Sequence, residues 1–414
     1  MPSMLGWFKR DYRLFLFALL VQRIATIALH GLHGPGHEWA VIANNLVAGK
    51  GFLFPFYGTD VPRYAFFPPF YPCYLALCKL LGGVHWVGFA QTIQGVLFAI
   101  GTVWTRRLAA RAIHADLSWP AGYVMAIWPP VLVFSTRLTP ACFNVALIPG
   151  ALLLTSIAIQ APRFWRIARA GAVYGILAYS LPSFQGSILF LPFVLRRLGY
   201  GWRRAILFAA CALVAAQVII SPWTIRNAVM FGRYVPVATN FGFNVYGSNN
   251  EFVQGNYNVL TSNTTTAVQA KLIDSHELAT MNEVDFDRKL LRQGVGYMVR
   301  HPLQTARRDL TRAFLLWWTD PAMVRYNRLD GLGSLIFMSL LLPFVAAGIW
   351  ASRKLPHGPA WHMIYATLLW ETVLYMNFGY RGRYGLELQP MLVIIGVLGA
   401  QSAVHAFRPA RSGA

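Results

Sequence analysis

The chain has 414 residues, of which 56% are hydrophobic and 12% are charged, and apolar runs recur along nearly its whole length. This pattern excludes an ordinary soluble domain and predicts an all-α polytopic membrane protein. The net charge of +21 does not indicate nucleic-acid binding, because Lys and Arg cluster between the apolar runs, where membrane topology requires them. The four cysteines lie in or beside apolar segments and indicate neither a disulfide nor a metal framework.

The first span fixes the orientation of the whole chain. Basic residues at 9–13 mark the cytoplasmic side, so the apolar run 14–32 is expected to span outward and to remain as an anchor. The first outer loop then covers 33–84. To return the next basic cluster to the cytoplasm, we interpret 67–83 as a short re-entrant or interfacial helix and 85–105 as the second span.

The later apolar runs predict the rest of the membrane region. The expected spans are 118–134, 141–160, two short antiparallel helices within 170–195, 204–221, 332–350, 359–378 and 384–405. The run 170–195 is divided because proline follows Leu181 and interrupts a helix there. About ten spans result, with both ends of the chain in the cytoplasm.

Three regions follow from this topology. An N-terminal membrane region covers 1–221, a large outer loop 222–330 and a C-terminal membrane region 331–414. Within the large outer loop, 240–266 is rich in Asn, Gly, Ser and Thr and is expected to be an irregular binding loop. Residues 285–318 are expected to form an amphipathic interfacial helix.

A series of motifs runs in one order along most of the chain. It consists of 42–52 with 67–72, then Ser221-Pro222-Trp223-Thr224-Ile225-Arg226-Asn227, Gly232-Arg233-Tyr234-Val235-Pro236-Val237, Gly247-Ser248-Asn249-Asn250, Arg300-His301-Pro302 and Arg381-Gly382-Arg383-Tyr384. In this series the chain resembles bacterial membrane glycosyltransferases of the GT-C superfamily, which include protein O-mannosyltransferases (glycosyltransferase family 39) and lipid A aminoarabinose transferases. The resemblance implies a GT-C-type bundle with outer-face amphipathic helices and one large outer loop.

The resemblance also implies an activity. A multi-pass enzyme of the inner membrane would transfer a sugar from a polyprenyl-phosphate carrier to an acceptor glycan, lipid or protein at the outer face, with inversion. Its partners would be that carrier, membrane lipid and the acceptor, and not nucleic acid. Glycosidases need two carboxyl groups because their leaving group is poor. A polyprenyl phosphate leaves without protonation, so one base suffices and no cofactor is required.

Glu38 is the candidate base. On a helix its side chain shares one face with Asn45, while Trp39 and Ile42 begin an apolar arc on the other. A base that deprotonates or orients the acceptor hydroxyl contributes about 10²–10⁴ in rate. The alternative is an acid that only stabilises a helix N-terminus. Relatives carry an aspartate where this chain has Gly34-Pro35-Gly36, so either Glu38 has taken over that role or activity has been lost.

The carrier phosphate needs cations. Arg381 and Arg383 lie at the outer end of a span, against the positive-inside trend, and a guanidinium binds phosphate through two hydrogen bonds. We expect these two residues, with Arg226 or Arg63, to hold the phosphate; the alternative is pairing with Glu387 or lipid headgroups. The other predicted substrate-binding residues are His37, Asn45, Tyr64, Asn227 and Tyr384.

Lipid and sugar contacts are expected from two further residue classes. Arg307, Arg308 and Arg312 are predicted to lie on anionic lipid. The abundant Trp and Tyr are typical of interfacial anchors, although Trp39, Tyr57, Tyr64 or Trp223 could instead stack on a sugar ring.

A metal site is a separate hypothesis. His30, His33 and His37, with the adjacent Glu38, have a spacing that permits a zinc-type site, so a divalent metal is possible. The glycines and Pro35 between them leave the geometry open. The alternative is that His30 merely ends the first span at the interface.

Two rival functions remain open. Glu371 and Arg23 fall inside predicted spans, where ionisable side chains are costly and often functional. If they do not neutralise each other, they favour a transporter or flippase of lipid-linked sugars. Relatives also carry a second acid in the next outer turn, where this chain has Arg137-Leu138-Thr139-Pro140-Ala141. The two missing family acids favour the other rival, a non-catalytic relative that binds lipid-linked sugars.

Overall fold

The computed structural model describes residues 4–29, 37–253, 256, 259–260, 271–319, 328–355, 357–379 and 382–407. Regular structure in these ranges is almost entirely helical. Their only sheet is a two-residue ribbon in which β1 (Phe54–Pro55) pairs antiparallel with β2 (Pro62–Arg63). The all-α architecture predicted from the sequence is confirmed.

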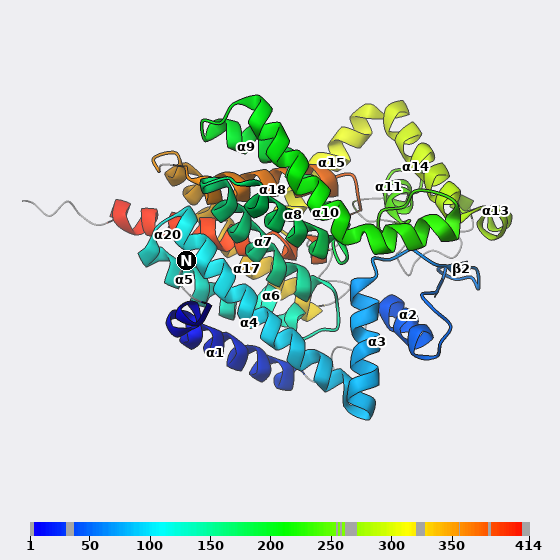
Figure 1. The fold of residues 1–414 in the computed structure, drawn as a ribbon, viewed down its shortest axis with the longest axis horizontal. Coiled ribbons are helices and arrows are strands. Elements are labelled where there is room, and N and C mark those ends of the chain that lie inside the picture. Colours follow the sequence, from blue (N-terminus) through cyan, green and yellow to red (C-terminus); the bar gives the residue numbers. More distant parts are fainter. Residues whose placement is uncertain are drawn as a thin grey trace, which may run out of the picture.

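The membrane region is one helical bundle (Figure 1). Its helices are α1 (Met4–Ala28), α4 (Trp86–Ala112), α5 (Ala115–Ile127), α6 (Pro129–Ser135), α7 (Ala141–Gln160), α8 (Phe164–Ala178), α9 (Leu191–Arg197), α10 (Trp202–Phe231), α17 (Arg328–Ser352), α18 (Pro359–Tyr375) and α20 (Gln389–Phe407). Helix α7 packs against α4, α8 and α18 and is buried along most of its length. Close packing of α8 on α10 requires glycine, because a Cβ on Gly171 would lie 2.1 Å from the carbonyl oxygen of Ala212.

Four helical segments are long and apolar enough to cross a membrane, in the part of the chain that the structure describes. They are Phe70–Ala112, Ala141–Gln160, Trp202–Phe231 and Gly331–Ser352. A fifth results if α5 and α6, bent by 52° where two prolines follow Trp128, are counted as one span. The protein is therefore polytopic, and the predicted total of about ten spans stays a prediction.

The first outer loop returns to the bundle through two helices. Helix α3 (Phe70–Gly82) and α4 are joined by the 3-10 turn η1 (Gly83–His85), and they run in different directions from this turn (Figure 1). Gly83 has a φ of 50°, which favours glycine. Two helices joined by a turn therefore lie where the sequence predicted a short helix and a following span, and which of them crosses the membrane stays a prediction.

Two other predicted spans have different boundaries in the structure. After α8, the chain breaks at Leu181 as predicted, but it resumes as the 3-10 helix η2 (Pro182–Phe190) before α9. Helix α10 does not end at Ser221. It continues through Pro222 and ends at Gly232, whose φ of 61° is typical of a helix C-cap.

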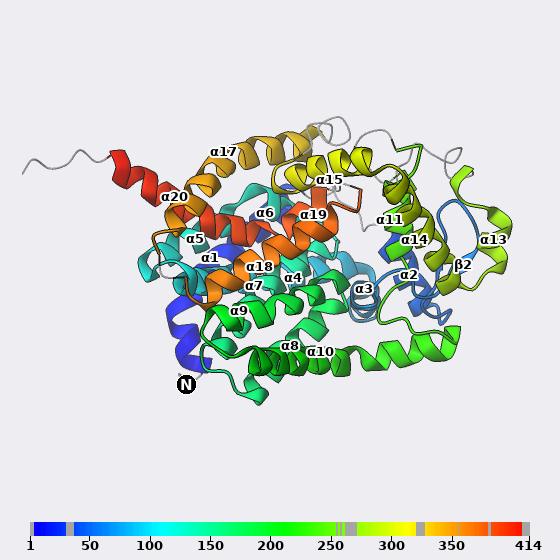
Figure 2. The same cartoon turned by 90° about the horizontal axis from the view of Figure 1, so that it is seen from above.

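Segments of the two predicted outer loops gather at one end of the long axis of the molecule, at the right of Figures 1 and 2. They include α2 (His37–Val47), α11 (Phe241–Ser248), α13 (Ser275–Thr280) and α14 (Glu283–Arg300). Helices α15 (Pro302–Trp317) and α19 (Gly382–Leu386) lie nearer the middle of the molecule (Figure 2). The start of α1 and the end of α20 lie toward the opposite end.

Helix α11 corrects the prediction of an irregular loop over 240–266. Its apolar side chains Phe243 and Val245 are buried, and the helix packs against α14. The contact is close, since a Cβ on Gly242 would lie 1.9 Å from the carbonyl oxygen of Asp287. Tertiary packing therefore makes a helix from a segment of low helix propensity.

Candidate functional site

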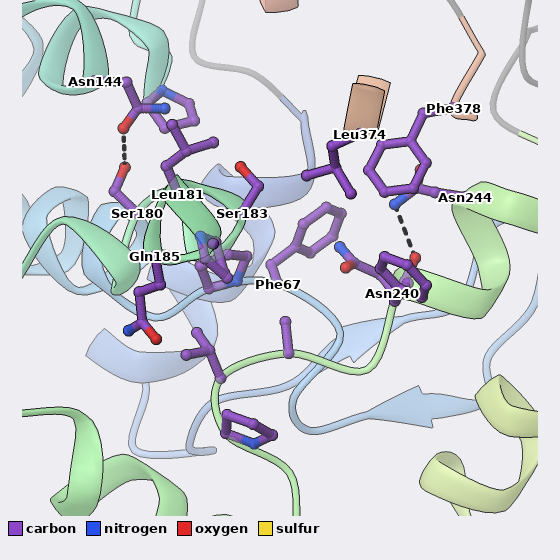
Figure 3. A pocket seen from close by; sticks show the side chains of 18 of the residues that line it. Phe67, Asn144, Ser180, Leu181, Ser183, Gln185, Asn240, Asn244, Leu374 and Phe378 are labelled. Carbon is purple, nitrogen blue, oxygen red and sulfur yellow. Dashed lines mark hydrogen bonds between the residues drawn. The ribbon is translucent and has the colours of Figure 1, made fainter. Parts of the chain in front are cut away.

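A cavity of about 890 Å³ lies where the outer segments meet the bundle. Its lining comes from the first outer loop, from α7, η2, α10, α11 and α18, and from the segment around α19. Figure 3 shows Asn144 and Ser180 on one side, Asn240, Asn244 and Phe378 on the other, and Phe67 between them. The cavity thus joins segments from both halves of the chain.

The lining is aromatic and rich in neutral hydrogen-bonding groups. Its amides and serine hydroxyls belong to Asn144, Ser180, Ser183, Gln185, Gln217, Asn240 and Asn244. Its aromatic rings belong to Trp39, Tyr57, Phe66, Phe67, Tyr71, Tyr234, Phe241, Phe243, Trp370, Tyr375, Phe378 and Tyr384. Aromatic faces beside amides and hydroxyls suit a ligand that is itself part apolar and part hydroxylated.

Glu387 is the only lining residue with a formal charge among the residues that the structure describes. It follows α19 directly and is 4% exposed. The Nδ2 of Asn144 donates to its Oε1 at 2.7 Å, and the hydroxyl of Tyr375 donates to its Oε2 at 3.0 Å. The hydroxyl of Ser180 in turn donates to Oδ1 of Asn144 at 2.7 Å. We call these four residues the Glu387 cluster.

Sequence reasoning noted Glu387 only as a possible partner of the nearby arginines. An acid within the last apolar run was the available signal. Its partners Asn144 and Tyr375 come from other helices and are 243 and 12 residues away along the chain. No local motif could connect the three.

Glu38 lies in the first turn of α2, as predicted. The helix buries Trp39, Ile42 and Ala43, whereas Val47 at its end is 43% exposed. Glu38 does not line the cavity, whereas Tyr57 does. The hydroxyl of Tyr57 donates to the Oε1 of Glu38 at 3.1 Å.

Four predicted substrate-binding residues, Arg63, Tyr64, Arg226 and Asn227, lie close together and do not line the cavity. Arg63 donates to the carbonyl of Leu278 at 2.8 Å, and Arg226 donates to the carbonyl of Tyr64 at 2.7 Å. Asn227 is fully buried and donates to the carbonyls of Val235 and Val237. The structure thus gives Arg63, Arg226 and Asn227 backbone partners in the outer loops.

These residues surround Glu283, which sequence reasoning missed. Its carboxylate accepts from the backbone N–H groups of Tyr64 at 2.6 Å and Ala65 at 3.1 Å, and from the hydroxyl of Thr239. Burial lowers the pKa of the Arg63 guanidinium, and the charge of Glu283 opposes this shift. The available signal was an acid directly after Asn282, which caps α14.

The remaining predicted positions are described only in part. Asn45 donates to the carbonyl of Leu53 at 2.9 Å. Tyr384 lines the cavity and stacks on Tyr375 with ring centroids 4.4 Å apart. Arg381, His30 and His33 lie outside the described residues, and so do the side chains of His37 and Arg383. Within the described ranges, no group of three or more His, Cys, Asp or Glu could hold a metal ion.

Arg312 corrects the prediction of a lipid-bound arginine face. Its side chain is 1% exposed and donates to the carbonyl of Ser248 at 2.6 Å and to that of Met376 at 3.4 Å. Burial lowers its pKa to about 10 and raises that of its partner Asp309 to about 6. Arg308 is half-buried and donates to the carbonyl of Val253. Of the three arginines predicted to lie on lipid, only Arg307 is exposed.

Glu371 is fully buried in α18, and Arg23 lies on α1. No ion pair joins them in the described structure. The one described hydrogen-bond partner of the Glu371 carboxylate is the hydroxyl of Ser183, at 3.5 Å, and Ser183 lines the cavity.

Comparison with known proteins gives no sequence-level match: no protein-family model matches the chain, and no curated protein matches it. Solved structures do match. ArnT from Cupriavidus metallidurans bound to undecaprenyl phosphate superposes with a TM-score of 0.54 and 16% identity, over 95% of this chain and 60% of that one. The Archaeoglobus fulgidus oligosaccharyltransferase in complex with Zn and sulfate superposes with a TM-score of 0.54 and 13% identity, over 94% of this chain and 49% of that one.

The same archaeal enzyme, AglB, in complex with an inhibitory peptide and a dolichol-phosphate, gives a TM-score of 0.51 and 13% identity, over 98% of this chain and 53% of that one. The chain therefore spans 49–60% of the length of these structures. At such low identity the likeness establishes the fold alone. The chain has the GT-C-type fold of these polytopic membrane proteins, as its sequence resemblance predicted.

Proposed function

We propose that this protein transfers a sugar from a polyprenyl-phosphate carrier to a hydroxyl group of an acceptor. The observation that carries the proposal is the cavity of about 890 Å³, whose aromatic and amide lining suits a sugar. The fold supports it, since structures with this fold bind undecaprenyl phosphate and a dolichol-phosphate.

The reaction takes place at the outer face of the inner membrane. The basic residues at 9–13 support a cytoplasmic location for the start of α1. The cavity is lined in part by residues of both predicted outer loops, such as Trp39, Tyr57 and Asn240. Helices α2 and α11 of these loops lie toward the end of the molecule away from the start of α1 (Figure 2). Arg381 and Arg383, which the sequence predicts at the outer end of a span, hold the carrier phosphate in pairs of charge-assisted hydrogen bonds.

The chemistry is a single displacement. The acceptor oxygen attacks the anomeric carbon from the face opposite the phosphate, so the configuration inverts. The bond between that carbon and the phosphate oxygen breaks, and its electron pair leaves with the polyprenyl phosphate. The proton of the acceptor hydroxyl passes to a base.

Glu38 is that base, and Tyr57 connects it to the cavity. Tyr57 lines the cavity, and its hydroxyl donates to Glu38 at 3.1 Å. As the acceptor hydroxyl gives its proton to the Tyr57 oxygen, the Tyr57 proton passes to the Glu38 carboxylate. No separate acid is needed, because phosphate is a good leaving group.

Release of free polyprenyl phosphate tests this proposal. Purified protein in lipid nanodiscs is given a panel of polyprenyl-phosphate sugars, and wild type is compared with Glu38→Gln, Tyr57→Phe and Arg383→Ala. We expect Glu38→Gln to reduce release at least about a hundredfold, and Tyr57→Phe to reduce it about tenfold or more, because each interrupts the proton path. Arg383→Ala should weaken carrier binding.

Two outcomes would contradict the proposal. Carrier binding without any release would mean that the protein is a non-catalytic sugar-lipid binder. Movement of intact labelled carrier across sealed vesicles, lost in Glu371→Gln, would mean that it is a flippase.

A further inference from the structure

Asn240 occupies the position from which an asparagine side chain ordinarily caps a helix. It directly precedes α11, yet its side chain makes no capping hydrogen bond. The carboxylate of Asp287, on α14, serves instead. Its Oδ1 accepts from the backbone N–H of Phe243 at 3.0 Å, and the N–H of Gly242 also donates to this carboxylate. The N-terminus of α11 is therefore capped from another helix and does not need the side chain of Asn240.

The side-chain amide of Asn240 is free to bind a ligand. Asn240 lines the cavity and is partly buried. Figure 3 shows it beside Asn244, on the side of the cavity opposite Asn144 and Ser180. Its backbone carbonyl accepts from Nδ2 of Asn244 at 2.8 Å, but its side chain bonds to none of the residues that the structure describes. A primary amide can donate and accept hydrogen bonds at the same time.

Asn240 lies on the same side of the cavity as the proposed proton path. Phe243 follows Asn240 by three residues, which is about one helical turn. The ring of Phe243 stacks on that of Tyr57, with centroids 5.8 Å apart and an interplanar angle of 20°. Tyr57 in turn donates to Glu38 at 3.1 Å. A ligand group at Asn240 therefore belongs to the molecule whose hydroxyl faces Tyr57, which is the acceptor.

The rings near Asn240 indicate the chemical class of this acceptor. Phe241 and Phe378 line the cavity and pack edge to face, with centroids 5.5 Å apart, and the exposed ring of Tyr234 also lines it. Aromatic rings beside an amide suit a sugar, which has an apolar ring face and a hydroxylated edge. A sugar also offers a second hydroxyl beside the attacking one, whereas a serine or threonine side chain has only one hydroxyl.

We propose that Asn240 binds the acceptor and that this acceptor is a sugar, whose hydroxyl next to the attacking one is held by the Asn240 amide. This inference rests on the proposed function, because Tyr57 and Glu38 identify the acceptor side of the cavity. Asn240 contacts the acceptor in this account and takes no part in proton transfer. An amide also pairs with a peptide backbone, so the experiment includes a peptide.

Binding of acceptor analogues tests the inference without turnover. Protein in nanodiscs with farnesyl phosphate is titrated with methyl glycosides of glucose, mannose, galactose, N-acetylglucosamine and arabinose, and with a blocked threonine tripeptide. Saturation-transfer NMR measures the affinities. Wild type should bind at least one glycoside more tightly than the tripeptide. Asn240→Ala should weaken that binding about 5- to 20-fold, because two hydrogen bonds are lost, and should leave the affinity for farnesyl phosphate within about twofold.

Asn282→Ala is the matched control, because it removes an asparagine that does cap a helix. The side chain of Asn282 accepts from the N–H of Val284 at 3.0 Å and donates to the carbonyl of Phe231 at 3.1 Å, and it does not line the cavity. This variant should unfold at a lower temperature and keep glycoside binding. Asn240→Ala should do the reverse, since Asp287 caps α11.

A second variant covers a failure to fold. If Asn240→Ala does not fold, Asn240→Ser replaces it, because serine is as good an N-cap residue as asparagine. Its single hydroxyl cannot make both hydrogen bonds of the amide, so we expect glycoside binding to weaken about threefold or more.

The outcomes separate this inference from the proposed function. Wild-type glycoside affinity in Asn240→Ala, or equal losses for glycoside and farnesyl phosphate, would overturn the inference. So would a wild type that binds no glycoside or prefers the tripeptide, even if it releases polyprenyl phosphate and so remains a transferase. Glycoside binding lost in Asn240→Ala, together with no turnover in the release assay, would uphold Asn240 as a sugar-binding residue and refute the transferase.

Discussion

Asp287 is a partly buried carboxyl at the contact between α11 and α14. Its Oδ1 accepts from the backbone N–H of Phe243 at 3.0 Å. Burial raises its pKa to about 6, the N–H groups of Phe243 and Gly242 oppose that shift, and the nearby charge of Glu283 adds to it. The folded protein therefore binds this proton more tightly than the unfolded chain, in which the pKa of Asp is near 4.

This shift predicts a pH dependence of stability. Because the folded-state pKa is raised, the stabilisation is present below pH about 4 and is lost as the pH rises to about 6. Relative to Asp287→Asn, the free energy of unfolding of wild type should fall by up to about 3 kcal/mol between pH 4 and pH 7. Thermal unfolding in detergent across this range measures the difference.

Asp60→Asn is the control, since Asp60 is an exposed carboxyl in the first outer loop. It reports the general effect of removing one negative charge. If wild type and Asp287→Asn lose stability in parallel from pH 4 to pH 7, the packing of Asp287 is not what we describe.

Among the secondary-structure elements, α10 connects the membrane region to the outer loops. Its 30 residues extend about 45 Å, which is longer than a hydrocarbon core of about 30 Å. The outer part carries Trp223, Arg226 and Asn227, which donate to carbonyls of the outer loops. The helix therefore extends out of the membrane region as a support for those loops.

Pro222 lies inside this helix and lacks the N–H that would bind the carbonyl of Val218. The hydroxyl of Ser221 donates to that carbonyl instead, at 2.8 Å. This substitution of a side-chain donor for a backbone donor explains how the helix continues past a proline.

A double-mutant cycle tests this compensation. Ser221→Ala alone should cost about 1 kcal/mol, because it leaves the Val218 carbonyl without its donor. In a Pro222→Ala background the backbone N–H returns, so the same change should cost less than about 0.3 kcal/mol. The free energies of unfolding of wild type, the two single variants and the double variant in mixed micelles give the coupling free energy between the two positions. Additive effects would show that Ser221 does not replace the missing donor.

Helix α15 connects three elements. Arg312 joins it to the end of α11 at Ser248 and to the residue after α18 at Met376. A fully buried guanidinium needs such partners, since an unpaired charge is costly to bury. The helix is thus fixed to the protein through Arg312 and is not held by lipid alone.

At the scale of the whole molecule, hydropathy and proline positions predicted much of the fold. Helix α7 has the predicted bounds, and the breaks after Gly82 and at Leu181 lie where expected. The extension of α10 was missed because proline is read as a helix breaker, although Ser221 compensates for it here. Helix α11 was missed because its stability comes from packing on α14.

The site was harder to predict because it is assembled from distant segments. The sequence identified Glu38 and Tyr384, and the structure places Tyr384 and the Glu38 partner Tyr57 at the cavity. The sequence could not show that Asn144 and Glu387, which are 243 residues apart along the chain, form a hydrogen bond. Basic residues are also ambiguous in a membrane protein, where Arg63 can serve loop packing as well as phosphate binding.

The most direct measurement follows the sugar itself. Wild-type protein in nanodiscs is incubated with the accepted carrier, labelled with ¹³C at the anomeric carbon, and with an extract of native membranes as the acceptor source. NMR then monitors that carbon. The account predicts that it leaves phosphate and appears in a new glycosidic bond of inverted configuration, and that Glu38→Gln prevents this. A label that stays on the carrier in the presence of wild type would contradict the transferase.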